Sequence, residues 1–189
     1  MRAALTLVWG IDCVDEATLQ SARRGDRNAQ ARLLNEFQDV WFRFCFSQLR
    51  NHDAAADATQ ETALRFLKQL SAFRGESQLQ TWSLGIALNV VREHKRKRTT
   101  AQVEDEHLAA ARSTEGSIGS DVELKDDKQM LRQNLDTLPD RQREAIVLRF
   151  FEEKSVEETA KIMDCAVGTV KATVHQALRA LRSKLMPSQ

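Results

Sequence analysis

Residues 155–171 read SVEETAKIMDCAVGTVK, and this stretch decides the fold of the last third of the chain. Ser155 followed by Glu158 at the third position after it is the pattern of a capping box, in which each side chain accepts a hydrogen bond from the other residue's backbone N–H. The pair predicts a helix that begins at Val156. A tight turn at residues 164–166 and a second helix follow. Two short amphipathic helices joined in this way are typical of a helix-turn-helix.

The second helix of this motif combines an apolar stripe with a basic outer face. The stripe recurs at helical spacing, predicts a buried side and comprises Val170, Val174, Ala177 and Leu181. Gln can pair with adenine, Lys with guanine and a methyl group with thymine, so the opposite side suits a DNA major groove. That side comprises Ala172, His175, Gln176 and Arg179, with Lys171 and Arg182 flanking it. The alternative is a basic surface helix of an unrelated bundle, but the capped helix before it favours the helix-turn-helix.

Composition and periodicity predict an all-α protein. The chain has 189 residues with only 2 Pro and 7 Gly, and it lacks any alternating Val/Ile/Thr-rich segment of strand length. A net charge of +1 argues against a generic polyanion binder, but the charge is segregated into a basic block at residues 92–98 and an acidic stretch at residues 104–127. Local fields, rather than the total charge, would therefore govern an encounter with DNA.

The apolar pattern divides the chain into two small helical domains. Helices are expected at about residues 54–70 and 79–97, after a helical stretch interrupted by a turn at Arg24-Gly25-Asp26. Ser, Thr, Gly and acidic residues then replace the apolar periodicity, which predicts a flexible linker. We expect a tail, a first domain, this linker and a second domain, at residues 1–15, 16–98, 99–120 and 121–187.

Several classes of function lack their usual sequence signals. Residues 3–9 are apolar but too short to span a bilayer, so we expect no membrane insertion and a cytoplasmic location. The 3 Cys and 4 His show no metal-ligand spacing, and we expect free thiols in a reducing cytosol and no metal. Clustered carboxylates and a nucleophile with its base are also missing. We therefore expect no catalytic residue, no cofactor and no small-molecule substrate.

Three segments of the first domain, taken together, follow a family pattern. They read DATQETALRF, FRGES and TWSLGIALN, at residues 57–66, 73–77 and 81–89. With the run from Leu138-Pro139 to Lys171, they resemble the extracytoplasmic-function (ECF) group of bacterial sigma-70-type initiation factors. The resemblance covers residues 16–98 and 122–185, and the order and spacing of the motifs make it specific.

The resemblance implies a promoter-specificity subunit that has no catalysis of its own. Such a factor binds core RNA polymerase through the β′ clamp and the β flap, reads the −35 element with its second domain, and recognises and melts the −10 element with its first. It implies promoter DNA and an anti-sigma factor as further partners. An acidic linker fits this function, because it could mimic nucleic acid in a positively charged channel.

The resemblance also assigns candidate site residues. The helix face that docks on the polymerase, for which a plain solvated face is the alternative, comprises Asp57, Gln60 and Glu61. The residues matched to −10 DNA are Arg65, Phe73, Ser77, Asn89, Arg92, Lys95 and Arg96. Those matched to −35 DNA are Thr169, Lys171, Ala172, His175, Gln176 and Arg179. Phe73 could equally be a core residue, and Trp82 is expected to anchor the core.

The chain departs from the family pattern at four positions. Ala166 stands where Ser or Pro is usual, which removes a helix cap worth about 1 kcal/mol. Thr173 and Gln176 occupy positions that are often Arg, so we expect a weaker salt dependence of DNA binding. Ser83 replaces a usual Leu, which predicts a modest change in the core.

Two other kinds of regulator could carry a similar second domain. A response-regulator type of activator or repressor would need an α/β receiver domain, and the first domain predicts no strands. A scaffold that binds only protein would not need the basic recognition helix. Both alternatives are therefore weaker than the initiation factor.

Overall fold

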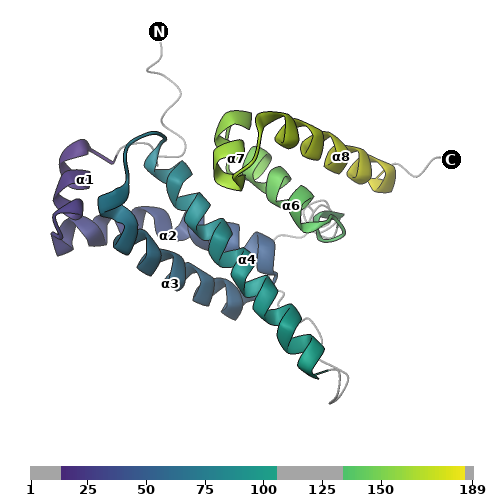
Figure 1. The fold of residues 1–189 in the computed structure, drawn as a ribbon, viewed down its shortest axis with the longest axis horizontal. Helices are drawn as coiled ribbons and strands as arrows, with labels where there is room; N and C mark the ends of the chain where they lie inside the picture. Colours follow the sequence, from purple (N-terminus) through teal and green to yellow (C-terminus); the bar gives the residue numbers. More distant parts are fainter. Residues whose placement is uncertain (1–13, 106–133, 186–189) are drawn as a thin grey trace, which may run out of the picture.

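The computed structural model describes residues 14–105 and 134–185, and all regular structure in these ranges is helical (Figure 1). The predicted all-α class is confirmed there. The N-terminal body contains α1 (Glu16–Arg23), α2 (Arg27–Leu49), α3 (His52–Gln69), the 3-10 turn η1 (Leu70–Ala72) and α4 (Leu79–Asp105). The C-terminal body contains α6 (Asp140–Ile146), the π-helical turn η2 (Val147–Phe151), α7 (Val156–Met163) and α8 (Val167–Leu185). Most of the predicted tail, most of the predicted linker and the start of the predicted second domain lie outside the described residues.

Side-chain caps fix where the N-terminal helices begin. Asp15, Asp26 and Asn51 each accept a hydrogen bond from the backbone N–H three residues ahead, at 2.6, 2.7 and 2.8 Å. These bonds satisfy donors that the first turn of a helix leaves without a partner. Gly25 takes a φ of +91° between α1 and α2, which is the turn predicted at Arg24-Gly25-Asp26.

The core of the N-terminal body is built around aromatic side chains from α2, α3 and α4. The ring of Trp41 lies 5.9 Å from that of Phe37 and 5.1 Å from that of Phe66. Trp82 continues the cluster, with its ring centroid 5.6 Å from Phe66 and 5.2 Å from Phe73. Tilted and edge-on pairs at these separations add to the apolar burial. Trp82 is thus the core anchor that the sequence predicts.

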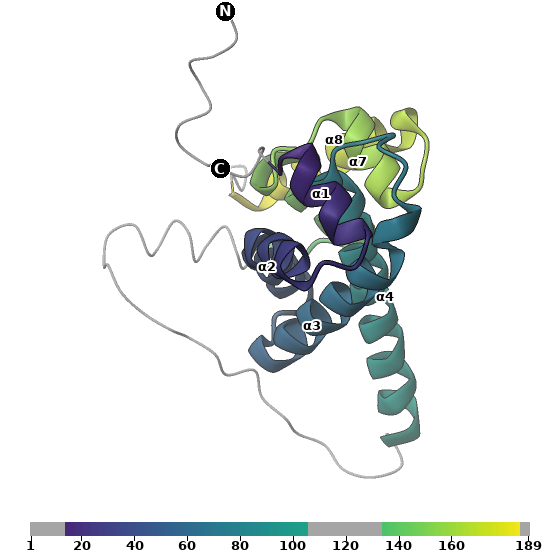
Figure 2. The same ribbon diagram turned by 90° about the vertical axis from the view of Figure 1, so that its left-hand side faces the viewer.

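Helix α4 continues farther than the sequence predicts. Its pattern of apolar residues ends near residue 97, yet the helix runs on to Asp105 and projects beyond the bundle (Figures 1 and 2). Residues 98–105 contain neither Gly nor Pro, and extending an existing helix costs much less than starting one.

The two bodies pack against each other. Helix α7 lies against α4 (Figure 2), and α6 contacts α2. One continuous apolar cluster joins the N-terminal core to Ala145, Val147, Leu148, Ile162 and Met163 from the C-terminal body. A second, smaller cluster belongs to the C-terminal body alone and includes Leu138, Ile146, Ala177 and Leu181. The sequence predicted the two bodies but not this contact between them.

Candidate nucleic-acid interface

The capping box at the start of α7 forms as predicted. The Ser155 hydroxyl accepts from the Glu158 N–H at 3.0 Å, and the Glu158 carboxylate accepts from the Ser155 N–H at 2.8 Å. At the other end, Asp164 closes α7 in the left-handed region with a φ of 52°. Ala166 stands before α8 and has no side-chain oxygen that could cap this helix. Only its carbonyl oxygen takes part there, and it accepts from the Val170 N–H at 3.2 Å.

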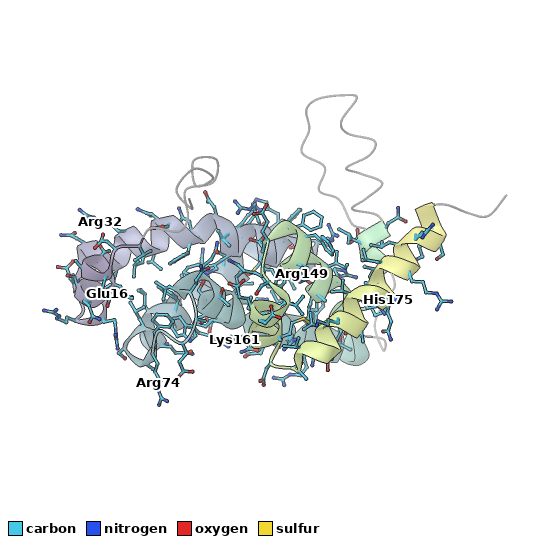
Figure 3. The ribbon with its side chains drawn as sticks, turned by 90° about the horizontal axis from the view of Figure 1, so that it is seen from above. Glu16, Arg32, Arg74, Arg149, Lys161 and His175 are labelled. Carbon is cyan, nitrogen blue, oxygen red and sulfur yellow. The ribbon has the colours of Figure 1, made fainter. Side chains whose placement is uncertain are left out.

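Helix α8 presents the predicted face to solvent. Val170 and Ala177 are fully buried, Leu181 is buried and Val174 is partly buried, so the predicted apolar stripe is confirmed. Every residue predicted to contact the −35 element is exposed, namely Thr169, Lys171, Ala172, His175, Gln176 and Arg179. His175 marks this helix in Figure 3. The face therefore combines cations, an amide and a methyl group on one accessible helix, as direct readout of a major groove requires.

An apolar groove of about 530 Å³ runs beside this face. Phe150 and Leu178 line it and remain 54% and 46% exposed, respectively. Its cationic lining residues are Arg149, Lys171, Arg179 and Arg182, and no acidic side chain of the described residues lines it. Apolar surface of this kind with a charged rim is typical of a protein-interaction site.

A second hollow, of about 410 Å³, lies between α3 and α4. It brings together some of the residues predicted to bind −10 DNA, namely Arg65, Asn89, Arg92 and Arg96. Asn89 and Arg96 are exposed. The volume and the mixture of guanidinium and amide groups suit a nucleotide unit.

Arg65 is engaged within the protein rather than free. Its guanidinium donates to both carboxylate oxygens of Glu93, at 2.6 and 2.8 Å, and to Glu61 at 2.6 Å. The hydrogen bonds to Glu93 and then Glu61 raise the pKa of Arg65, and the bond from Arg65 lowers the pKa of Glu93. Two carboxylates neutralise this arginine, so in this conformation it orients α3 against α4.

The other predicted −10 residues lie apart from this hollow. Phe73 is only 7% exposed and packs on Trp82. Of the two roles that the sequence left open for Phe73, it therefore takes the core role in this structure. Ser77 is partly buried in the loop before α4. Lys95 points to another side of α4, where its ammonium pairs with Asp140 at 2.7 Å.

Residues of the C-terminal body cover part of the predicted −10 surface. Glu144 is 2% exposed and accepts two hydrogen bonds from the Arg92 guanidinium, at 3.1 and 2.7 Å. The Lys161 ammonium donates to the Glu76 carbonyl oxygen at 2.8 Å, within the loop that precedes α4. The sequence does not predict a role for Glu144 or Asp140, because both lie on a short helix whose residue pattern gives no indication of a distant partner.

The predicted polymerase-docking residues lie along α3. Asp57 and Gln60 are exposed, whereas Glu61 is partly buried and paired with Arg65. Leu64, one turn farther on, is 53% exposed. The face therefore mixes acidic and amide groups with one accessible apolar side chain.

The described part of the chain offers neither a membrane span nor a metal site. None of its helices is long and apolar enough to cross a membrane. Within residues 14–105 and 134–185, no group of His, Cys, Asp and Glu side chains is arranged to hold a metal ion.

Comparison with known proteins accounts for both bodies. Residues 33–100 match the profile of Sigma-70 region 2, and residues 128–181 match that of Sigma-70 region 4. The chain is 30% identical to the RNA polymerase sigma-H factor of Pseudomonas aeruginosa over 92% of its own length and 94% of that protein. It is 38% identical to the ECF sigma factor EcfG of Rhodopseudomonas palustris over 75% of each. The chain belongs to the ECF group of the sigma-70 family.

This sigma factor is a transcription initiation factor that binds RNA polymerase. Solved structures share its fold. The sigma factor RpoE of Bartonella quintana, in complex with the anti-sigma factor NepR, superposes with a TM-score of 0.69 at 26% identity, over 84% of this chain and 98% of that one. CnrH, in complex with the cytosolic domain of CnrY, gives 0.67 at 20% identity over 92% and 97%, which supports the fold alone.

Proposed function

We propose that this sigma factor selects promoters by placing α8 in the major groove of a −35 element and the α3–α4 surface on a −10 element, where it melts the duplex. The first DNA-reading unit would lie within residues 121–187 and the second within residues 16–98. It would act without catalysis of its own. The exposed face of α8 is the observation that carries the proposal, because its six candidate residues are all accessible while the stripe behind them is buried.

Each side chain on α8 has a defined chemical role in this proposal. Lys171 and Gln176 would donate to base edges, and the Ala172 methyl group would contact thymine. Arg179 would neutralise a phosphate, which fixes the register of the helix on the duplex without reading sequence. Thr173 occupies a position that is often Arg in the family, so the face carries fewer cations. The affinity for DNA should therefore fall less steeply as the salt concentration rises.

The N-terminal body would engage the −10 element. Flipping a base out of the stack costs a few kcal/mol, which stacking and hydrogen bonds to the base edge must recover. Asn89 and Arg96 are exposed at the hollow between α3 and α4 and would supply such bonds. Phe73 would support the loop that carries Ser77 from inside, rather than stack on the base itself.

Two surfaces would hold the polymerase. Asp57, Gln60 and Glu61 would dock on the β′ clamp, and the apolar groove beside α8 would receive an apolar segment of the β flap. The cationic rim of the groove favours a partner segment with acidic flanks. An anti-sigma factor is a further proposed partner, since the RpoE structure described above is a complex with the anti-sigma factor NepR.

Run-off transcription tests this function directly. Core polymerase is combined with genomic promoter fragments, with and without the protein, and transcript start sites are mapped. We expect defined starts behind a shared −35/−10 pair only when the protein is present. Starts that do not depend on the protein, or tight sequence-specific binding by the protein alone, would contradict the proposal.

A further inference from the structure

A further hollow, of about 430 Å³, lies where the two bodies meet. Its walls come from the corner between α2 and α3, from the second half of α4 and from α6. The bodies are joined beside it, since Arg50 at this corner forms an ion pair with Asp136, shortly before α6. Among the described residues, it shares no lining residue with the hollow between α3 and α4 or with the groove beside α8. It is therefore a separate site, which we term the interbody pocket.

The described lining of the interbody pocket is strongly positive. It contains four permanent cations and one carboxylate, namely Arg50, Lys95, Arg98, Arg143 and Asp140. The charge of Asp140 is offset by its neighbours, because its carboxylate lies 2.7 Å from the Lys95 ammonium and 3.7 Å from the Arg143 guanidinium. A concave surface in which cations outnumber carboxylates in this way attracts anions.

Two arginines on different walls of the interbody pocket have donors to spare. The Nε and Nη2 atoms of Arg143 donate to three carbonyl oxygens of residues 135–138, at 3.1, 2.9 and 3.0 Å, whereas its Nη1 atom makes no hydrogen bond with a described residue. This guanidinium is thus held in place with one end open. Arg98 on α4 is exposed and forms no hydrogen bond or ion pair with another described residue. Guanidinium groups match the oxygens of a phosphate, so each arginine can hold one phosphate group.

A buried amide indicates a second kind of group in the ligand. Gln48 lines the interbody pocket and is only 2% exposed, yet its Oε1 atom has no hydrogen-bond partner among the described residues. Leaving a buried acceptor without a donor is costly, and a ligand in the pocket can supply that donor. The exocyclic amino group of a nucleobase is such a donor. The His94 ring lines the same pocket and offers a face on which a base can stack.

We propose that the interbody pocket binds a purine nucleoside diphosphate. Arg98 and Arg143 hold the two phosphates, and the Gln48 carbonyl oxygen accepts from the amino group of the base. The volume of the pocket lies in the range of small-molecule sites. This inference goes beyond the proposed function, because Gln48, Arg98 and Arg143 are not among the residues proposed to read promoter DNA.

Isothermal titration calorimetry of the full-length protein with ADP, GDP and pyrophosphate tests the inference without polymerase or DNA. Arg98→Gln removes an exposed phosphate contact. Gln48→Leu replaces the amide by an apolar side chain of similar size, which removes the unpaired acceptor while keeping the packing. Lys97→Gln is the matched control, because it removes a cation at an exposed, neighbouring position of α4 that lines neither the groove nor either hollow.

We expect at least one of the two nucleotides to bind roughly tenfold or more tightly than pyrophosphate. Arg98→Gln should weaken the nucleotide and pyrophosphate alike, by roughly tenfold, and Gln48→Leu should weaken the nucleotide alone. Lys97→Gln should change neither affinity appreciably.

Three results would overturn the inference. If neither nucleotide binds, the pocket is not a nucleotide site. If pyrophosphate binds as tightly as the nucleotides, the pocket holds anions without recognising a base. Equal losses from Arg98→Gln and Lys97→Gln would mean that binding reflects only the general charge of α4. If Gln48→Leu unfolds, the comparison of the two nucleotides with pyrophosphate, and of Arg98→Gln with Lys97→Gln, still decides the matter, because both of these side chains are exposed.

Discussion

Trp41 on α2 donates its indole N–H to the Ser83 hydroxyl on α4 at 3.0 Å, and both side chains are fully buried. The Ser83 hydroxyl in turn donates to the Gln80 carbonyl oxygen at 2.8 Å. Leu is usual at this position in the family, and the sequence therefore predicted only a modest change of packing. The structure instead gives the serine a defined partner, because a buried indole N–H needs an acceptor.

Replacing Ser83 by Ala should lower the free energy of unfolding by about 1–3 kcal/mol, since it leaves the Trp41 N–H buried without an acceptor. Urea denaturation followed by tryptophan fluorescence measures the change. Ser71→Ala is the control, because Ser71 is exposed and should change stability by less than about 0.5 kcal/mol. If both substitutions lowered the free energy of unfolding equally, the hydrogen bond from the indole would not contribute the stability that we expect.

Features set by residues close together in the chain were predictable. Ser155 and Glu158 cap α7 as expected, because the capping box depends only on neighbouring residues. Val170 and Ala177 are buried as expected, because helical spacing fixes which side of α8 they share.

Features set by the approach of distant segments were not predictable. Arg92 and Glu144 stand 52 positions apart, and nothing in the local pattern of either helix marks them as partners. The same holds for Trp41 and Ser83, which are 42 positions apart. For Phe73, sequence alone left core packing and base contact open, and only its position against Trp82 shows that the ring is buried.

Glu153 should respond to substitution in an unusual direction. It has a φ of 51°, a conformation that costs a residue with a Cβ about 1–2 kcal/mol. Burial raises the pKa of the adjacent Glu152, and the Glu153 carboxylate adds to that rise. Glu153→Gly should therefore raise the free energy of unfolding by up to about 1 kcal/mol, after allowing for the greater freedom of glycine in the unfolded chain.

The matched control for this substitution is Glu157→Gly, inside the first turn of α7. There the same exchange should lower stability by about 1 kcal/mol, because glycine is a poor helix former. Opposite signs in thermal or urea unfolding would support the assignment of strain at Glu153. A loss of stability at both positions would count against it.

The Glu158 carboxylate should make stability depend on pH. Burial acts to raise its pKa, but hydrogen bonds from the Ser155 N–H and the Thr81 hydroxyl outweigh burial, so the pKa is lowered overall. A carboxylate with a lowered pKa stabilises the fold at pH above its unfolded pKa, and that contribution is lost as pH falls through the folded pKa. Glu158→Gln keeps the capping geometry but removes the charge.

This variant should be less stable than the wild type by about 0.5–1 kcal/mol at neutral pH, and the difference should close as the solution becomes more acidic than the ordinary glutamate pKa. Urea unfolding at a series of pH values gives both curves. Glu157→Gln, one position earlier in the same helix turn, corrects for the general effect of a negative charge near a helix N-terminus. A stability difference that widened in acid would contradict a lowered pKa for Glu158.

Lys171 should affect promoter recognition more than assembly with polymerase. Its ammonium lies on the exposed face of α8, and it forms no ion pair with another described residue. Lys171→Ala should cost the holoenzyme about 1–3 kcal/mol in affinity for its promoter, which is roughly 5- to 150-fold. Lys184→Ala removes the same charge from the same helix outside the proposed face, and should change affinity much less. Filter binding measures promoter affinity, and co-purification with core polymerase measures assembly. If Lys171→Ala weakened both to the same extent, α8 would be acting mainly in polymerase docking, and the proposed reading of the −35 element would lose its support.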